Sequence, residues 1–236
     1  MIALAAGLAT GVLPDWGGIA QAVAPFPAKF KNEGKHGGEH VSATEDLMRQ
    51  HSLLRRILNV YSELAQRLQR NEGDIDTIAL EKAAKLFHDF GEDYHELLEE
   101  AYIFPEMSSA GGPNRKVVEV LLLQHQRGRE ITDYLYQVGS RGTIAGEAEP
   151  LAKALASIAR MYSAHAAWED TVIFPIWESI QSKERLEDLA RKFEDIEHEK
   201  FGKDGFQDAV ACISKIEQAL GLADLVAFTA PPPPTA

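Results

Sequence analysis

Apolar residues recur at intervals of three and four along most of the chain after residue 41, and no convincing run of alternating apolar and polar residues is seen. Such spacing places the apolar side chains on one face of a helix, where they can be buried. Four long helices are predicted in this way, over residues 42–73, about 76–104, 113–139 and about 147–175. The pattern therefore predicts an all-α protein built as a helical bundle.

Local signals mark several of the helix ends. Ser42 followed by Glu45 is the pattern of a capping box at the start of the first helix. Pro105 is expected to end the second helix, because proline has no N–H to donate and its ring clashes with the preceding turn. Pro113 suits the first turn of the third helix.

Two further helices are expected after the fourth, over residues 183–201 and 204–220, with Gly202 between them. They would form a C-terminal helical region at 181–222 that covers one side of the bundle. A proline-rich tail at 223–236 follows, and its four consecutive prolines at 231–234 cannot be helical.

The first 41 residues are rich in Gly, Pro and Ala and are predicted to form a non-helical arm. A short apolar run at 2–12 is followed by Ala20-Gln21-Ala22, which is typical of a signal-peptidase site. An export signal needs a positive charge before the run, and none is present. The arm is either the remnant of an export signal that starts upstream or a plain arm. We favour the remnant, and with it a periplasmic or exported protein over a cytoplasmic one.

Composition excludes several classes of function. The 236 residues carry a formal net charge of -12, and an acidic surface repels the phosphates of nucleic acid. No run is long and apolar enough for a transmembrane segment. The single cysteine, Cys212, excludes an intrachain disulfide, a cysteine zinc site and an iron–sulfur cluster held by this chain alone.

Each of the four main helices carries one histidine on its apolar face: His51, His95, His125 and His165. Burying four imidazoles without partners would cost several kcal/mol, so something must satisfy them. Two of these histidines have a glutamate four residues later, at Glu99 and Glu169, and such pairs lie on one face of a helix. Histidines and glutamates that face the interior of a bundle in this way build two-metal sites.

An internal repeat supports the metal site. Residues 95–105 and 165–175 both follow the pattern H-x-x-x-E-[ED]-x-x-I-F-P, and residues 50–55 and 124–129 both read Q-H-x-x-x-R. The chain therefore resembles two helical hairpins, each with one lone histidine and one His–Glu pair. Four histidines and two glutamates suit iron better than magnesium, which prefers oxygen ligands alone, and manganese or zinc remains an alternative.

The repeated motif resembles the hemerythrin-like family of HHE cation-binding domains, over roughly residues 42–180. The resemblance implies an up-down-up-down four-helix bundle around a non-haem centre of two iron ions. It also implies the metal ligands His51, His95, Glu99, His125, His165 and Glu169. Related domains use a glutamate directly after the second-helix histidine as well, which makes Glu96 a further candidate ligand.

The resemblance implies a protein that binds or reacts with oxygen, peroxide or nitric oxide, and whether it is an enzyme stays open. Oxygen-carrying hemerythrins use five histidines, whereas four occupy clear motif positions here, so oxidation is expected rather than reversible oxygen carriage. One alternative is iron storage or handling, or a structural metal site without turnover. Another is a partner-binding bundle with incidental histidines, against which the repeat argues. The sequence identifies no protein partner.

Several residues near the predicted ligands have open roles. His88 is expected to be a hydrogen-bonded core or relay residue, with an auxiliary metal ligand as the alternative. His198, in the helix predicted over residues 183–201, either contacts the site or lies apart from it. Gly91 and Gly128 indicate either close helix packing or open space for a small ligand, and Tyr162 is expected to donate a hydrogen bond to that ligand.

Overall fold

The structure is a computed structural model and describes residues 41–70, 75–109, 112–202 and 204–234. Every regular element in these ranges is helical, so the predicted all-α class is confirmed. The elements are α1 (Ala43–Gln69), α2 (Thr77–Leu86), η2 (Phe87–Glu96), η3 (Glu99–Ile103), α3 (Phe104–Ser109), α4 (Gly112–Ser140), α5 (Ala148–Trp168), η4 (Glu169–Ile173), α6 (Phe174–Ser179), α7 (Lys183–Phe201), α8 (Gly205–Leu220) and the 3₁₀ turn η5 (Leu225–Phe228).

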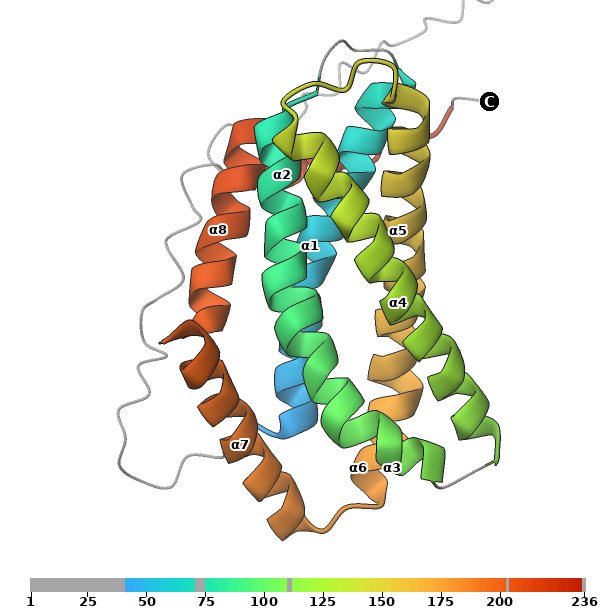
Figure 1. The fold of residues 1–236 in the computed structure, drawn as a ribbon, viewed down its shortest axis with the longest axis vertical. Helices are drawn as coiled ribbons and strands as arrows, with labels where there is room; N and C mark the ends of the chain where they lie inside the picture. The colour runs from blue at the N-terminus through green and yellow to red at the C-terminus, as the bar shows by residue number, and fades with distance from the viewer. Residues whose placement is uncertain (1–40, 71–74, 110–111, 203, 235–236) are drawn as a thin grey trace, which may run out of the picture. The chain divides into compact units, whose positions relative to one another are not determined.

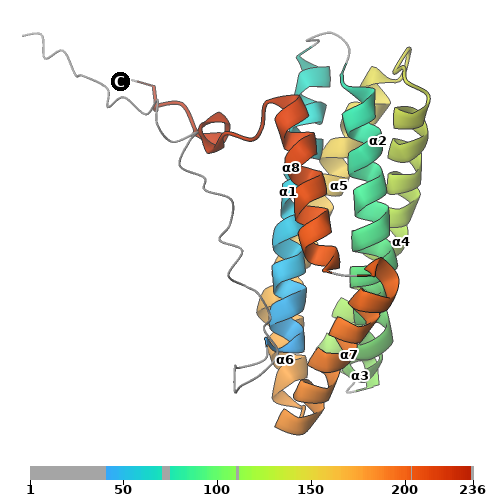
Figure 2. The same cartoon turned by 90° about the vertical axis from the view of Figure 1, so that its left-hand side faces the viewer.

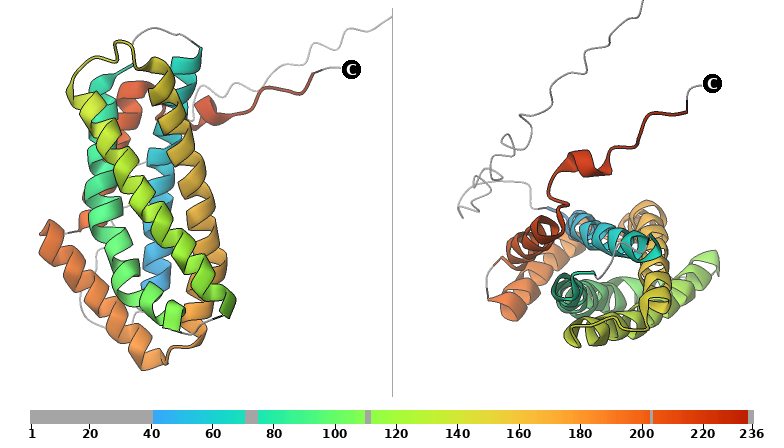
Figure 3. Two further views of the ribbon diagram at one scale, coloured as in Figure 1. Left: turned by 45° about the vertical axis from the view of Figure 1, so that its right-hand side comes forward. Right: turned by 90° about the horizontal axis from the view of Figure 1, so that it is seen from above.

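Four long helical segments run alternately up and down, as the predicted bundle requires (Figure 1). They are α1, the continuous segment from α2 to α3, α4, and the continuous segment from α5 to α6. Helix α1 packs along α5, α2 packs along α4, and α4 also contacts α5 (Figure 3). The two C-terminal helices lie against α1 and α2, as Figure 2 shows.

The start of α1 forms as its sequence predicts. The Ser42 hydroxyl accepts a hydrogen bond from the Glu45 N–H at 3.1 Å, and the Glu45 carboxylate accepts one from the Ser42 N–H at 3.0 Å. These two bonds satisfy backbone donors that the helix itself cannot pair. The two predicted C-terminal helices are also confirmed, and each ends at a glycine with positive φ, Gly202 and Gly221.

The predicted end of the second helix at Pro105 is wrong. The chain stays helical to Ser109, because the five residues before Phe104 form a π turn in which the Phe104 N–H bonds to the carbonyl of Glu99. Pro105 follows this turn directly, and because it has no N–H it leaves one carbonyl of the preceding turn without a backbone donor. The same arrangement recurs at Phe174, which bonds to Glu169 just before Pro175.

Beyond η5, the described residues near the C-terminus form no further regular element. The predicted N-terminal arm and its export pattern lie outside the described residues, apart from residue 41. Residues 231–234 have no helix, as their prolines predict. Among the described residues, no helix is both long enough and apolar enough to cross a membrane.

Helix α4 approaches α2 closely at Gly139, since a Cβ added there would lie 2.7 Å from the backbone nitrogen of Glu81. We expect Gly139→Ala to lower the free energy of unfolding by about 1–3 kcal/mol through overpacking, which outweighs the gain of roughly 1 kcal/mol in helix propensity. Urea unfolding at matched metal content measures the change. The control is Gln137→Ala on the exposed side of α4. Equal stability of the two variants would contradict the close contact.

Candidate metal centre

Four histidines, one from each helical segment of the bundle, meet around two glutamates. The glutamates Glu99 and Glu169 stand in the two π turns η3 and η4. All six side chains belong to residues that are at most 3% exposed. Their ligand atoms form two groups, each within 4.8 Å: His51, His95 and Glu99, and Glu99, His125, His165 and Glu169. The structure therefore brings together the six predicted ligands that belong to the repeated motif.

Each carboxylate lies between a histidine of the first half and a histidine of the second. Glu99 approaches the Nε2 atoms of His95 at 3.3 Å and of His125 at 3.5 Å. Glu169 approaches the Nε2 atoms of His165 at 2.9 Å and of His51 at 3.3 Å. Both glutamates thus occupy positions from which they can bridge two metals, one beside His51 and His95 and the other beside His125 and His165.

The donor set fits a bound cation. All four carboxylate oxygens of Glu99 and Glu169 are buried and have no hydrogen-bond partner among the described residues, because the nearby ring nitrogens lack hydrogen-bond geometry. The Nε2 atoms of His125 and His165 also face each other at 3.0 Å. Buried carboxylates without donors are costly, whereas a metal would satisfy oxygens and nitrogens together.

The outer nitrogen of every histidine has a partner. An acceptor at Nδ1 keeps the proton on that nitrogen, so that the Nε2 lone pair faces the centre. The four Nδ1 contacts are His51 to Asp170 at 2.6 Å, His95 to Gln50 at 2.9 Å, His125 to Glu100 at 2.8 Å, and His165 to Gln124 at 2.9 Å.

The internal repeat explains this outer set. In each half, the glutamine before the lone histidine binds the histidine of the His–Glu pair in the same half. The acid that follows the glutamate of that pair binds the lone histidine of the other half. The arginine of Q-H-x-x-x-R then pairs with that acid, Arg55 with Asp170 and Arg129 with Glu100. The phenylalanine of I-F-P packs near the same rings, Phe174 on His51 and Phe104 on His125. The motif contained these residues, but their pairing between halves requires the folded chain.

Glu96, the seventh candidate ligand, lies beside the inner cluster, and its carboxylate has partners of its own. Its carboxylate accepts a hydrogen bond from the Tyr162 hydroxyl at 2.5 Å and lies 2.8 Å from the Arg129 guanidinium. It approaches His125 at the outer Nδ1, at 3.8 Å. Glu96, Glu100 and His125 form a third possible cation group, but Arg129 already supplies positive charge there.

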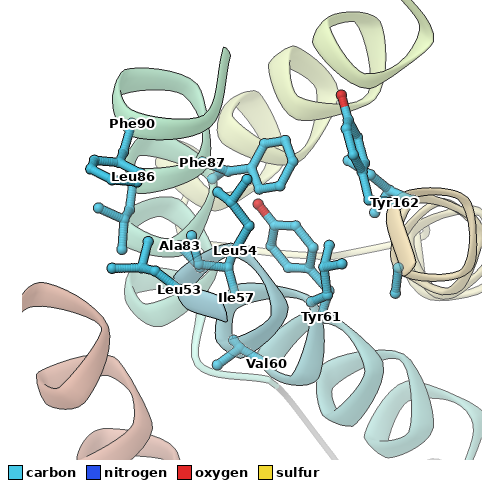
Figure 4. Packing of buried hydrophobic residues seen from close by; sticks show 14 of the residues in the cluster. Leu53, Leu54, Ile57, Val60, Tyr61, Ala83, Leu86, Phe87, Phe90 and Tyr162 are labelled. Carbon is cyan, nitrogen blue, oxygen red and sulfur yellow. The ribbon is translucent and has the colours of Figure 1, made fainter. Parts of the chain in front are cut away.

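Of the two interpretations of Gly128, close packing is confirmed, whereas Tyr162, expected to donate to a bound ligand, donates to Glu96. Tyr162 binds Glu96, and its hydroxyl fills the space at Gly128, where an added Cβ would lie 1.8 Å from it. Gly91 also reflects packing, since an added Cβ would lie 3.2 Å from a Leu54 methyl. In Figure 4 the Tyr162 ring projects from α5, and its centroid lies 4.9 Å from that of the Phe87 ring. At both glycines, the absence of a Cβ therefore allows a side chain of another helix to pack closely.

His88 and His198 lie outside the site. The His88 side chain is 46% exposed and contacts Asp89 at 3.2 Å, and His198 is exposed on α7. An α-helix would place His88 two turns before His95 on the same face. The intervening residues form the π-helical segment η2, in which seven residues no longer make whole turns, so His88 is rotated away.

Buried charges perturb the pKa values in the cluster. Burial lowers the pKa of His51 and His125, but the surrounding carboxylates, led by Asp170 and Glu100 respectively, outweigh it and raise the two values to about 9 and about 10. Burial raises the pKa of Glu96 to about 8. Burial also acts against ionisation of Glu99, yet His95 and His125 hold the pKa of that carboxyl well below its usual value.

The bundle and its buried cluster of four histidines and two glutamates define a helical cation-binding protein. The chain belongs to the family of the hemerythrin HHE cation-binding domain, whose model matches residues 42–177. It is 41% identical over 191 residues to uncharacterized proteins of Mycobacterium bovis and of two strains of Mycobacterium tuberculosis, covering 80% of this chain and 74% of each relative. No solved structure matches the chain.

The metal-free protein should lose stability as pH rises from about 6.5 to about 9. In this window folded His51 and His125 keep protons that the unfolded chain releases near 6.5. Because the folded state binds more protons, stability falls by about 1.4 kcal/mol per pH unit for each such proton. Urea unfolding after chelation, at pH 6 and pH 9, measures the loss. A variant with glutamine at both positions should show a flatter profile, and an unchanged slope would contradict the assignment.

Proposed function

We propose that the chain binds two iron ions between its four helices and that this centre binds or reacts with oxygen, peroxide or nitric oxide. His51 and His95 would hold one ion, His125 and His165 the other, and Glu99 and Glu169 would bridge them. The observation that carries the proposal is the position of the two unpartnered carboxylates between two histidine pairs.

The chemistry of the donors supports iron. Imidazole nitrogens combined with carboxylate oxygens suit iron, zinc and manganese, whereas calcium and magnesium prefer oxygen alone. Bridging carboxylates favour a pair of ions over a single one, since each glutamate has an oxygen near a histidine of both pairs. Glu96 would be an additional ligand only if it turned from Tyr162 and Arg129 towards the centre.

The side chains around the centre determine what can reach it. Bound iron would supply redox chemistry towards a small ligand at positions that the protein leaves open. Phe104 and Phe174 pack near the histidine rings with centroids at 5.4 and 5.7 Å, and both are nearly or wholly buried. Together with the surrounding leucines they exclude bulk water, so that solvent competes weakly with the ligand.

Protein produced with iron should contain about two iron atoms per chain. His165→Ala should lose metal and unfold at a lower temperature, because metal bound only by the native state stabilises that state. Elemental analysis and thermal unfolding measure both effects. The controls His88→Ala and His198→Ala should keep the metal, because neither side chain lies at the centre. One tightly bound zinc without iron would reject the proposed centre.

The reduced, iron-loaded protein should change its near-ultraviolet absorption when mixed with oxygen or peroxide, because the centre has positions open to a small ligand. Stopped-flow spectroscopy follows this change, and the chelated protein serves as the blank. We expect irreversible oxidation rather than oxygen carriage, because the centre has four histidines whereas oxygen-carrying hemerythrins have five. An adduct that releases oxygen under vacuum would contradict that expectation. No spectral change with two irons bound would favour storage or a structural role.

A further inference from the structure

A second group of buried oxygens lies outside the metal centre. Besides the four carboxylate oxygens of the centre, four buried side-chain oxygens have no hydrogen-bond partner among the described residues. One belongs to Glu96, which has an ion pair with Arg129. The other three belong to Tyr61, Glu92 and Thr132, and each of these residues is at most 2% exposed. Buried oxygens without donors are costly, so three of them together call for a shared partner.

The three side chains come from elements that pack against one another. Tyr61 belongs to α1, Glu92 to η2 and Thr132 to α4, and η2 packs against both of the other helices. In Figure 4 the Tyr61 hydroxyl points from α1 towards Phe87 of η2. Burial, and after it the charge of Glu92, raises the pKa of Tyr61. Burial also raises the pKa of Glu92, and the Thr132 hydroxyl acts against that rise.

Glu92 stands between the protein surface and the metal centre on one helical segment. His88, four residues before it, has a side chain that is 46% exposed. Glu96, four residues after it, accepts a hydrogen bond from Tyr162, whose ring centroid lies 5.3 Å from that of His165. All three positions on η2 lie in its π-helical segment, and π-helical turns are frequent at functional sites. Groups that can hold a proton therefore follow one another from solvent to the candidate ligands.

The proposed reaction consumes protons. Reduction of peroxide to two waters takes two electrons and two protons, and two ferrous ions supply the electrons. The protons have to cross a buried shell, in which the rings of Phe104 and Phe174 have no group that can exchange a proton. A carboxyl group can do so, because it donates a hydrogen bond when neutral and accepts one when ionised. Burial favours the neutral form, so Glu92 holds a proton that it can release.

We propose that Glu92 transfers protons between solvent and the metal centre, and that Tyr61 and Thr132 hold its carboxyl group in place through internal water. Water both donates and accepts hydrogen bonds and therefore satisfies all three oxygens. A proton leaves Glu92 towards Glu96, and solvent beside His88 replaces it. The inference rests on the proposed function, because only a reacting centre consumes protons. The titratable and charged groups around Glu92 are Tyr61 of α1, His88 and Glu96 of η2, Arg129 and Asp133 of α4, and Tyr162 of α5.

Glu92→Gln tests the route in the iron-loaded protein. The reduced protein is mixed with peroxide in weakly buffered solution, where absorption follows oxidation of the iron and a pH-indicator dye follows proton uptake. Both should be slower than in the wild type by roughly tenfold or more, because an amide does not release a proton. The rate should fall further in deuterium oxide, and Glu92→Asp, which keeps a carboxyl group, should recover much of it. The matched control is Glu197→Gln, a buried glutamate that accepts from the Phe206 N–H, which should react as the wild type does.

The internal water is tested in the chelated protein by Tyr61→Phe. If water bonds to the hydroxyl, the variant should unfold at a lower urea concentration than the wild type, since that bond is lost. A hydroxyl without any partner gives the opposite sign, because its removal relieves the cost of burying it. A variant that is more stable than the wild type would therefore overturn the water.

Thr132→Val keeps the test of the route decisive if Glu92→Gln loses iron. It removes another oxygen around the carboxyl group with little change in shape, and it should slow oxidation and proton uptake by less than Glu92→Gln does. Wild-type rates in whichever of these variants retains two irons would overturn the route and leave the metal centre standing. An iron-loaded wild type that does not react with peroxide would instead reject the proposed function, and the route with it.

Discussion

The carboxylates of Glu99 and Glu169 lie wholly inside the bundle, and their burial constrains everything around them. Transfer of an ionised carboxylate out of water costs several kcal/mol unless positive charge compensates it. In the metal-free chain, protons on His51 and His125 supply part of that charge, which is why their pKa values lie far above 6.5. The sites that bind protons in the metal-free protein are thus the sites that would bind cations, and the two compete.

Orientation of the histidines depends on contacts that cross between the halves of the chain. Asp170 of the second half orients His51 of the first, and Glu100 of the first half orients His125 of the second. Neither hairpin therefore contains a complete set of oriented ligands. The C-terminal helices extend this support, because Phe201 packs on Tyr94 with ring centroids at 5.3 Å, and the Tyr94 hydroxyl accepts from the Gln50 amide that orients His95. Helix α7 thus supports the orientation of His95 indirectly, through Tyr94 and Gln50.

Much of the fold and the six central residues could be predicted from the sequence, because α-helical periodicity and the internal repeat both indicate which face of each helix is buried. The π turns could not be predicted, since their bonding shifts by one residue without a residue type that requires it. This shift accounts for the wrong end at Pro105 and for the wrong placement of His88. The hydrogen bond of Tyr162 to Glu96 could not be predicted either, because Gly128 alone does not reveal that the phenol of Tyr162 fills its space.

A repeat that duplicates ligands need not duplicate their environment. Glu100 and Arg129 beside His125 have counterparts in Asp170 and Arg55 beside His51. Glu96, which Tyr162 and Arg129 hold, has no acidic counterpart, because Ala166 stands at its position in the second half. A charged, hydrogen-bonded surround stabilises changes in charge on a bound metal, and an apolar one disfavours them. A cation beside one histidine pair would therefore change charge less readily than a cation beside the other. The asymmetry arises at a position between the shared motif residues, where the first half has Glu96 and the second has Ala166.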